Sequence, residues 1–271
     1  MLRSKSRVLA LVPAAVLALA AAGCGSSDSS GGTGAPTPGG VTLIQSGKVL
    51  TCTGLPYEPF QFEKDGKVVG FDVDLVDLVA KKLNATQEVI DTPFEGIQSG
   101  VDLNSGKCDL AAAGMTIDDT RKENFDFSDP YFDATQVLVG KKGAGLTGLD
   151  KLQGKKLGVQ NGTTGAKYAK EKAPDVEQVV FEDLGLLLSG LETGAVDAAI
   201  NDNGVVYDWV NKHADYEVGT EFATGEQYGI GVKKGNTALL KVINETIAET
   251  RASGQYDTIY EKWFGKKPES K

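Results

Sequence analysis

The sequence predicts an α/β protein with two lobes of similar construction. Short apolar runs alternate with helical patterns from Lys48 onward, and this alternation is typical of parallel sheets that are covered by helices on both faces. Residues 106–112 are echoed by residues 194–200, because in both segments a helical stretch is followed by a glycine, an aspartate and a strand of small residues. Two copies of one α/β unit therefore indicate two lobes.

Length and composition exclude several classes of function. The chain has 271 residues, a formal net charge of −9 and 24% charged residues, which is typical of a globular protein with room for two ordinary domains. The acidic balance argues against a nucleic-acid partner. The single histidine, His213, excludes any site built from several histidines and is interpreted as a surface residue. We expect no metal, no cofactor and no catalytic residue.

The N-terminus has the features of a lipoprotein signal peptide. Three basic residues precede an apolar stretch over residues 8–22, which is shorter than the roughly 20 residues of a membrane-spanning helix. Small residues directly before Cys24 resemble the bacterial lipobox, although Ala21 stands where a leucine is usual. Residues 1–23 are therefore the predicted signal peptide, and Cys24 is the predicted lipidated first residue of the mature chain. The alternative is an ordinary cleaved signal followed by a chance cysteine.

A tether follows this cysteine. Residues 24–45 are rich in Gly, Ser and Pro, a composition that is typical of a flexible linker. A lipid on Cys24 and such a linker would hold an acidic domain at the extracytoplasmic face of the cell membrane.

Hydrophobic periodicity places two helices and the strands. Apolar residues at helical spacing over residues 74–83 predict one helix, and those over residues 239–247 predict another, which Gly254 ends. Strands are expected at residues 49–53, 109–115, 136–139, 156–160, 198–201 and 228–232.

Two glycine-rich segments have different interpretations. Residues 143–148 fit the dinucleotide-binding pattern GxGxxG, but the next strand begins near Lys156, too soon for the crossover helix that this motif needs. We therefore interpret them as a loop. Residues 158–165 lie between a strand and an expected helix, where Thr163, Thr164 and the free N–H groups of the helix start suit an anion. A threonine there also caps a helix, and both roles can hold at once.

Arg121 and Asp202 each follow a predicted strand of small residues. Ligands of open α/β sheets bind beyond the carboxyl ends of the strands, so both side chains can reach such a ligand. The guanidinium of Arg121 can bind a carboxylate bidentately, and the carboxylate of Asp202 can pair with an ammonium group. The alternatives are a surface arginine on a helix and a helix N-cap.

Two aromatic residues and two cysteines complete the candidates. Tyr57 and Phe94 follow predicted strands and could form the wall of a ligand pocket, or belong to the core. Cys52 lies in one predicted strand and Cys108 directly before a neighbouring one. In an exported protein such a pair forms a disulfide, and two reduced buried cysteines are the alternative.

Several motifs occur together in the order found in one known family. With them, residues 46–266 resemble the solute-binding proteins of polar amino-acid ABC transporters, family 3. The resemblance implies a type II periplasmic-binding-protein-like fold, with two lobes of parallel or mixed sheets joined by a two-strand hinge. Lobe 1 is expected at residues 46–132 plus 231–267, and lobe 2 at residues 137–226. The motifs are Tyr57-Glu-Pro-Phe60, Gly70-Phe-Asp-Val-Asp74, Gly114-Met-Thr116-Ile-Asp-Asp-Thr-Arg121, Phe125-Asp-Phe-Ser-Asp129-Pro-Tyr131, Gly158-Val-Gln-Asn-Gly-Thr-Thr164, Tyr228-Gly-Ile-Gly and Trp263-Phe264-Gly.

The resemblance also implies a set of ligand-binding residues. Arg121 would bind the α-carboxylate of an amino acid, and Asp202 its α-ammonium group. The rest of the set is Gly114 and Thr116 at both α groups, Thr164 at the carboxylate, Tyr57 and Phe94 beside the ligand side chain, and Gln160 and Asn201 as candidates for recognising it.

One departure from the family bears on the ligand. Gly54 stands where glutamine binders and basic-amino-acid binders of this family often have aspartate. This weakens a prediction of lysine, arginine or histidine, and also removes a group that would bind a glutamine amide. We expect a polar ligand, with glutamine or glutamate favoured.

The resemblance implies a binding protein and not an enzyme. A monomer would capture the amino acid by hinge closure and deliver it to an ABC permease with its ATPase subunit. Two alternatives remain. One is a cyclohexadienyl-dehydratase-like enzyme on the same fold, for which Glu58 is the nearest candidate carboxylate, and the other is an amino-acid sensor domain.

Overall fold

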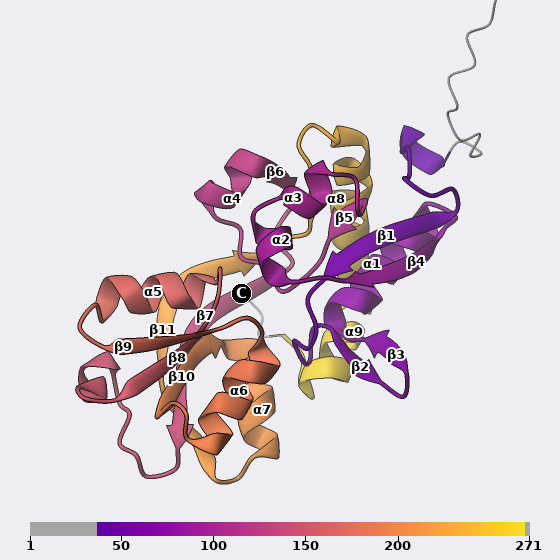
Figure 1. Ribbon diagram of the computed structural model, residues 1–271. Coiled ribbons are helices and arrows are strands. Elements are labelled where there is room, and N and C mark those ends of the chain that lie inside the picture. Colours follow the sequence, from indigo (N-terminus) through magenta and orange to yellow (C-terminus); the bar gives the residue numbers. More distant parts are fainter. Residues whose placement is uncertain (1–36, 269–271) are drawn as a thin grey trace, which may run out of the picture. The chain divides into compact units, whose positions relative to one another are not determined.

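The computed structural model describes residues 37–268, and Figure 1 shows their path. The predicted signal peptide, Cys24 and the first part of the predicted linker lie outside the described residues. Two five-stranded sheets form the frame. In spatial order, the first contains β4 (Thr86–Asp91), β1 (Lys48–Thr53), β5 (Leu110–Ala111), β12 (Gly231–Lys233) and β6 (Phe125–Phe127), and the second contains β11 (Tyr216–Tyr228), β7 (Phe132–Lys141), β10 (Ala198–Asp202), β8 (Lys156–Gln160) and β9 (Glu177–Phe181).

Both sheets are mixed. β1 runs parallel to β4 and β5, and β8 runs parallel to β9 and β10, so the predicted parallel pairing is confirmed for these strands. β12 is antiparallel to β5 and β6, and β7 is antiparallel to β10 and β11, so the sheets are mixed, which is one of the two sheet types predicted. The reason is that β7 and β12 enter their sheets from the other sheet through short connections, whereas parallel neighbours are joined by long crossovers.

Four of the six predicted strands are confirmed, as β1, β7, β8 and β10. The predictions of the other two strands are only partly right. Residues 109–115 contain the two-residue strand β5, and residues 228–232 span the end of β11 and the start of β12. The sequence did not predict β4 and β9, which are edge strands with exposed and half-buried residues instead of an apolar run.

The chain passes between the sheets twice, and the two connections lie side by side. Residues 128–131 lead from β6 to β7, and residues 229–230 lead from β11 to β12. The N–H of Tyr131 donates to the carbonyl of Tyr228 at 2.9 Å, and the N–H of Ser128 donates to the carbonyl of Ile230 at 2.9 Å. These hydrogen bonds pair the two connections.

Helices cover both sheets. α1 (Phe71–Lys82), α8 (Thr237–Ala252) and α9 (Gln255–Phe264) pack on one another beside the first sheet. The helices predicted at residues 74–83 and 239–247 are confirmed by α1 and α8, and Gly254 separates α8 from α9 in a left-handed conformation. α5 (Thr164–Lys172) lies on one face of the second sheet, and α6 (Leu184–Thr193) and α7 (Asn203–Lys212) lie on the other (Figure 1).

Shorter elements complete this part of the chain. α2 (Phe94–Gln98), α3 (Val101–Asn104) and α4 (Asp119–Asn124) connect strands of the first sheet, and β2 (Phe62–Lys64) and β3 (Lys67–Val69) form a hairpin. The 3₁₀ helices are η1 (Pro38–Gly40) and η2 (Leu149–Leu152). Residues 143–148 form no crossover helix before β8, which confirms their interpretation as a loop. Within residues 37–268, no helix has the length and apolar character to cross a membrane.

Cys52 and Cys108 form a disulfide, as predicted. Cys52 lies near the end of β1, Cys108 lies just before β5, and both side chains are buried. The bond therefore ties two paired strands whose ends lead into the site described below.

Replacing both cysteines by serine is expected to lower the free energy of unfolding by about 4 kcal/mol, because the bond closes a long loop in the unfolded chain. The sequence separation that sets this value is 56 residues. Urea denaturation of the double variant and of the oxidised protein measures the difference. Equal denaturation midpoints would contradict the prediction.

Candidate functional site

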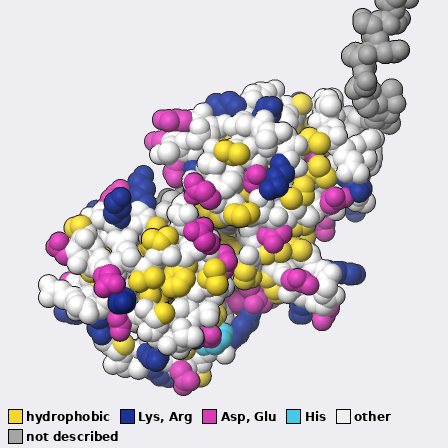
Figure 2. All heavy atoms as spheres, viewed as in Figure 1, with side chains coloured by type: hydrophobic (Ala, Val, Ile, Leu, Met, Phe, Trp, Pro, Cys, Tyr) yellow, Lys and Arg dark blue, Asp and Glu magenta, His cyan; other side chains and the backbone are white. Residues whose placement is uncertain are grey.

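A cavity of about 270 Å³ opens at the carboxyl ends of strands from both sheets. Its walls come from the segments that follow β1, β4 and β5 in the first sheet and β8, β9 and β10 in the second. This is where open α/β sheets bind their ligands. Figure 2 shows acidic and hydrophobic side chains gathered about the hollow at the middle of this face.

The structure places nearly all of the predicted binding residues at this cavity. The two charged members, Arg121 and Asp202, are both nearly inaccessible to solvent. The predicted residues that line the cavity are Tyr57, Phe94, Gly114, Thr116, Arg121, Gln160, Thr164 and Asp202. Asn201 lies behind the wall, where its Nδ2 donates to Gln160 Oε1 at 3.3 Å.

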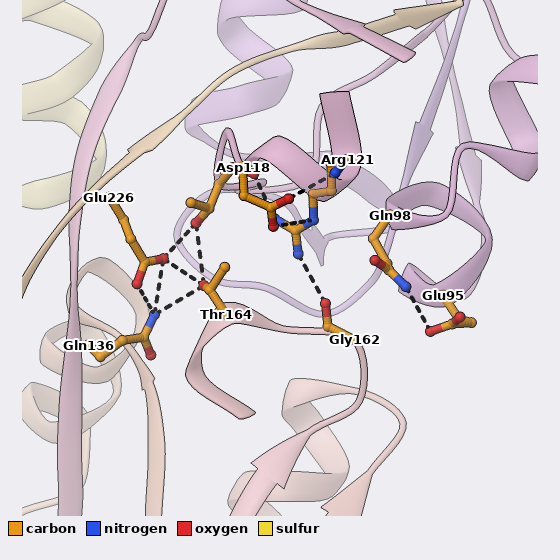
Figure 3. Close-up of polar contacts among 9 residues, drawn as sticks. Glu95, Gln98, Asp118, Arg121, Gln136, Gly162, Thr164 and Glu226 are labelled. Carbon is orange, nitrogen blue, oxygen red and sulfur yellow. Dashed lines mark hydrogen bonds and ion pairs between the residues drawn. The ribbon is translucent and has the colours of Figure 1, made fainter. Parts of the chain in front are cut away.

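Arg121 is held by both sheets. It lies in α4, which Asp118 caps by accepting the N–H of Arg121 at 2.8 Å. Its Nη1 donates to the carbonyl of Thr116 at 2.7 Å, and its Nη2 donates to the carbonyl of Gly162 at 3.0 Å (Figure 3). The guanidinium carbon also lies 5.3 Å from the centre of the Phe94 ring. Burial lowers the pKa of Arg121, and the carboxylate of Asp118 opposes this.

Asp202 is a buried carboxylate with three side-chain donors. Tyr57 donates to its Oδ2 at 2.9 Å, Tyr228 donates to the same oxygen, and Gln136 Nε2 donates to Oδ1 at 2.5 Å. The pKa of Asp202 is raised to about 6, because burial and the nearby carboxylate of Glu226 raise it by more than the three hydrogen bonds lower it. The side chain does not cap α7, although Asp202 is the residue that precedes this helix.

Tyr57 and Gly114 fit together at the floor of the cavity. Gly114 has a φ of +52°, and a Cβ on it would lie 2.6 Å from Tyr57 Cε1, so a side chain there would displace the ring. The N–H of Gly114 donates to Asp72 Oδ2 at 2.8 Å. Burial raises the pKa of Asp72 to about 7.

Thr163 and Thr164 lie where α5 begins. Thr163 is the N-cap and accepts the N–H of Ala166 at 3.1 Å, which confirms the capping interpretation. The first N–H groups of a helix have no partner within the helix, so the start of α5 still offers donors to the cavity.

Two residues of the polar network were not predicted from the sequence. Glu226, near the end of β11, accepts hydrogen bonds from Thr116 at 2.8 Å, Thr164 at 2.6 Å and Gln136 at 3.1 Å (Figure 3). Gln136 lies in β7 and is fully buried. An irregularity in the β11–β7 pairing between Phe222 and Glu226 shifts the register by two residues and places Glu226 opposite Ala134. Glu226 is therefore on the same face of the sheet as Gln136.

Two further candidates from the sequence lie outside the cavity. Glu58 forms an ion pair with Lys212 at 2.8 Å and is not among the lining residues. His213 stacks on Trp209 and lies 3.3 Å from Glu192. Within residues 37–268, no group of three metal-ligating side chains is placed to hold a metal ion.

Two mixed α/β sheets, two paired connections and a cavity at the strand ends define the type II periplasmic-binding-protein-like fold. The sequence model of the bacterial extracellular solute-binding proteins, family 3, matches residues 49–266. The chain belongs to this family, as the motifs predicted.

Known relatives support this assignment. A "probable histidine-binding protein" of Neisseria gonorrhoeae is 35% identical over 92% of this chain and 92% of its own length. The glutamine-binding protein GlnH of Bacillus subtilis is 34% identical over 75% of both chains. The solved structure of an ancestral arginine-binding protein bound to arginine has a TM-score of 0.76 at 43% identity, covering 81% of this chain and 99% of that one. Each is named as a binding protein, which confirms the predicted class and disfavours the dehydratase alternative.

The burial of Asp202 makes the stability of the protein depend on pH. Because its folded pKa of about 6 lies above its ordinary value of 3.8, the ionised group destabilises the ligand-free protein above pH 6, and this cost disappears as the pH falls towards 4. Asp202→Asn removes this titration, although its NH₂ group faces one of the donors that Asp202 accepts from. Relative to the unaltered protein, its free energy of unfolding is therefore expected to be up to about 3 kcal/mol more favourable at pH 8 than at pH 4.

Thermal and urea denaturation between pH 4 and pH 8 measure this relative stability, which should decrease as the pH falls through 6. Asp65→Asn, on the exposed turn between β2 and β3, is the control and should change little. An equal relative stability of Asp202→Asn at pH 4 and pH 8 would contradict the prediction.

Proposed function

We propose that the protein binds a polar amino acid as the extracytoplasmic component of an ABC importer. The observation that supports this best is one buried cation and one buried anion on the walls of the same cavity. Arg121 follows β5 of the first sheet, and Asp202 ends β10 of the second. The α-carboxylate and α-ammonium groups of an amino acid satisfy both.

The α-carboxylate would bind at Arg121 and at the start of α5. Two of the five N–H donors of Arg121 are used by backbone carbonyls, so others remain for a carboxylate. The free N–H groups of α5 and its helix dipole also favour an anion. The α-ammonium group would then bind at Asp202.

The charge of the cavity limits the ligand side chain. Asp91, Glu182 and Asp183 also line it, and Arg121 is the only basic residue among the lining residues described. Once Arg121 and Asp202 are paired with the α groups, these three carboxylates face the rest of the ligand. Of the two ligands that the sequence favoured, glutamine fits this environment and glutamate does not. A positively charged side chain is also compatible.

The two sheets with their helices would act as the two lobes. Residues 128–131 and 229–230 would serve as the hinge, because these are the paired connections between the sheets. Arg121 to Gly162, Tyr57 to Asp202, and Glu58 to Lys212 are contacts between groups from different sheets. A ligand that bridges the walls favours the closed state, because only that state makes both sets of contacts.

The N-terminal features complete the proposal. A lipid on Cys24 would anchor the chain at the outer face of the membrane, and the linker would let the domain, as a monomer, reach the permease. Relatives that are named as binding proteins of ABC transporters support the association with a permease.

Arg121→Lys is expected to raise the Kd for the bound amino acid at least a hundredfold. A lysine keeps the charge but loses the planar bidentate hydrogen bonds, and its ammonium cannot donate to both carbonyls and a ligand in the same geometry. Isothermal titration calorimetry measures the Kd. Lys122→Ala, at the exposed neighbouring residue of α4, is the control. A Kd within threefold of the unaltered protein would sink this assignment.

A ligand panel tests the charge of the cavity. Glutamine and arginine are expected to raise the melting temperature, whereas glutamate is expected to bind at least tenfold more weakly than glutamine. Glu182→Gln should narrow that gap, because it removes one lining carboxylate, while Glu177→Gln on β9 outside the cavity should not. Glutamate binding as tightly as glutamine would contradict the prediction.

A further inference from the structure

Glu226 occupies hydrogen-bond donors that the family resemblance assigned to the ligand. Its Oε2 accepts from the hydroxyls of Thr164 and Thr116 at 2.6 and 2.8 Å, and its Oε1 accepts from Gln136 Nε2 at 3.1 Å. In Figure 3, Thr164 and Gln136 both point towards this one carboxylate. Both threonines line the cavity, so their hydrogen-bond direction affects any ligand.

The direction of these hydrogen bonds follows from the chemistry of the groups. A hydroxyl has one proton and two lone pairs, and an ionised carboxylate only accepts. Thr116 and Thr164 therefore give their single protons to Glu226. Thr164 Oγ1 also accepts a long hydrogen bond from Gln136 Nε2 at 3.4 Å, which leaves it one lone pair. Both threonines therefore present acceptors, and not donors, to a ligand.

Gln136 links Glu226 to Asp202, because its amide nitrogen donates to both carboxylates. Its amide has two N–H groups, and Nε2 lies 2.5 Å from Asp202 Oδ1 and 3.1 Å from Glu226 Oε1. The reversed amide would turn its oxygen towards two carboxylates, so the network fixes this orientation. The neutral amide bridges two anions without neutralising either.

The cluster is short of positive charge. Asp202 and Glu226 face Tyr57, Tyr228, Gln136 and the two threonines, none of which is a cation. Among the described residues that line the cavity, Arg121 is the only basic one. Arg121 already faces Asp118 at 3.6 Å. An ammonium group is the ligand that such a cluster of acceptors and anions favours.

We propose that Glu226 is a positioning residue that makes this cluster a receptor for the ligand α-ammonium group. By holding the protons of Thr116 and Thr164, it turns their oxygens into acceptors that act together with Asp202. The α-carboxylate is then left to Arg121 and the N–H groups of α5, and the Thr164 hydroxyl does not bind it. This inference rests on the proposed function.

Glu226→Gln tests the proposal, because the amide removes a charge and directs its own N–H at a threonine oxygen. The probes are L-arginine and argininic acid, which has a hydroxyl in place of the α-ammonium group, with L-glutamine and its 2-hydroxy analogue as a second pair. Calorimetry at pH 7.5 should show at least a tenfold rise in Kd for the amino acid and less than a twofold change for the hydroxy acid.

The matched control is Glu217→Gln. Glu217 is on the same strand as Glu226, but it accepts the N–H of Gly143 away from the cavity. This variant should bind both probes as the unaltered protein does. If Glu226→Gln fails to fold, Thr164→Val removes one acceptor oxygen. It should weaken the amino acid selectively, whereas a hydroxyl that donated to the carboxylate would affect both probes equally.

The outcomes distinguish a failure of the proposed role of Glu226 from a failure of the proposed amino-acid-binding function. Unchanged amino-acid binding by Glu226→Gln, or an equal loss for both probes, overturns the role of Glu226 and leaves the proposed function standing. If the unaltered protein binds no amino acid of the panel, the proposed function fails and this inference fails with it.

Discussion

The hydrogen bonding of one buried carboxylate, Asp202, organises the cleft. Taking a carboxylate out of water is unfavourable unless hydrogen bonds replace its hydration. Here Tyr57 reaches it from the segment after β1, Tyr228 from the end of β11 and Gln136 from β7. Donors from both sheets and from the strands that connect them therefore meet at a single group, and the geometry of the cavity depends on their meeting.

Tyr57 and Gln136 can approach Asp202 closely because glycines stand at two neighbouring positions. A Cβ on Gly114 would lie 2.6 Å from the Tyr57 ring, and a Cβ on Gly165 would lie 2.5 Å from Gln136 Oε1. Both distances are too short for a real contact. The glycines therefore let Tyr57 and Gln136 reach Asp202, which explains why two positions with no side-chain chemistry of their own belong to the site.

The charges of the site favour ligand binding at some expense of stability. Buried Arg121 and Asp202 each have a pKa shifted by burial towards the uncharged form, which means that the ligand-free fold is less stable than it would be with neutral groups there. A zwitterion compensates both charges at once. Strain or unfavourable charge at a binding site is a common trade between stability and function, and closure about a hinge is the motion that would bring the two charges onto one ligand.

Much of this protein could be predicted from the sequence because the signals are local. Apolar periodicity located α1 and α8, and runs of apolar or small residues located β1, β8 and β10. The rule that ligands bind at the carboxyl ends of strands singled out Arg121 and Asp202, and neighbouring strands paired Cys52 with Cys108. The edge strands β4 and β9 escaped prediction because their exposed residues blur the apolar pattern. The directions of β7 and β12 within their sheets could not be read from local patterns, because each enters from the other sheet.

By itself, then, the sequence determined the family, the strand ends and the two charged residues at them. Only the tertiary structure decided how the hydroxyls of the site are directed. Thr116, Gln136, Thr164 and Glu226 come from four separate segments of the chain, and the irregular pairing of β11 places Glu226 opposite Ala134 of β7. A hydroxyl has one proton, so its role towards a ligand depends on which neighbour takes that proton, and no pattern along the chain records which neighbours meet.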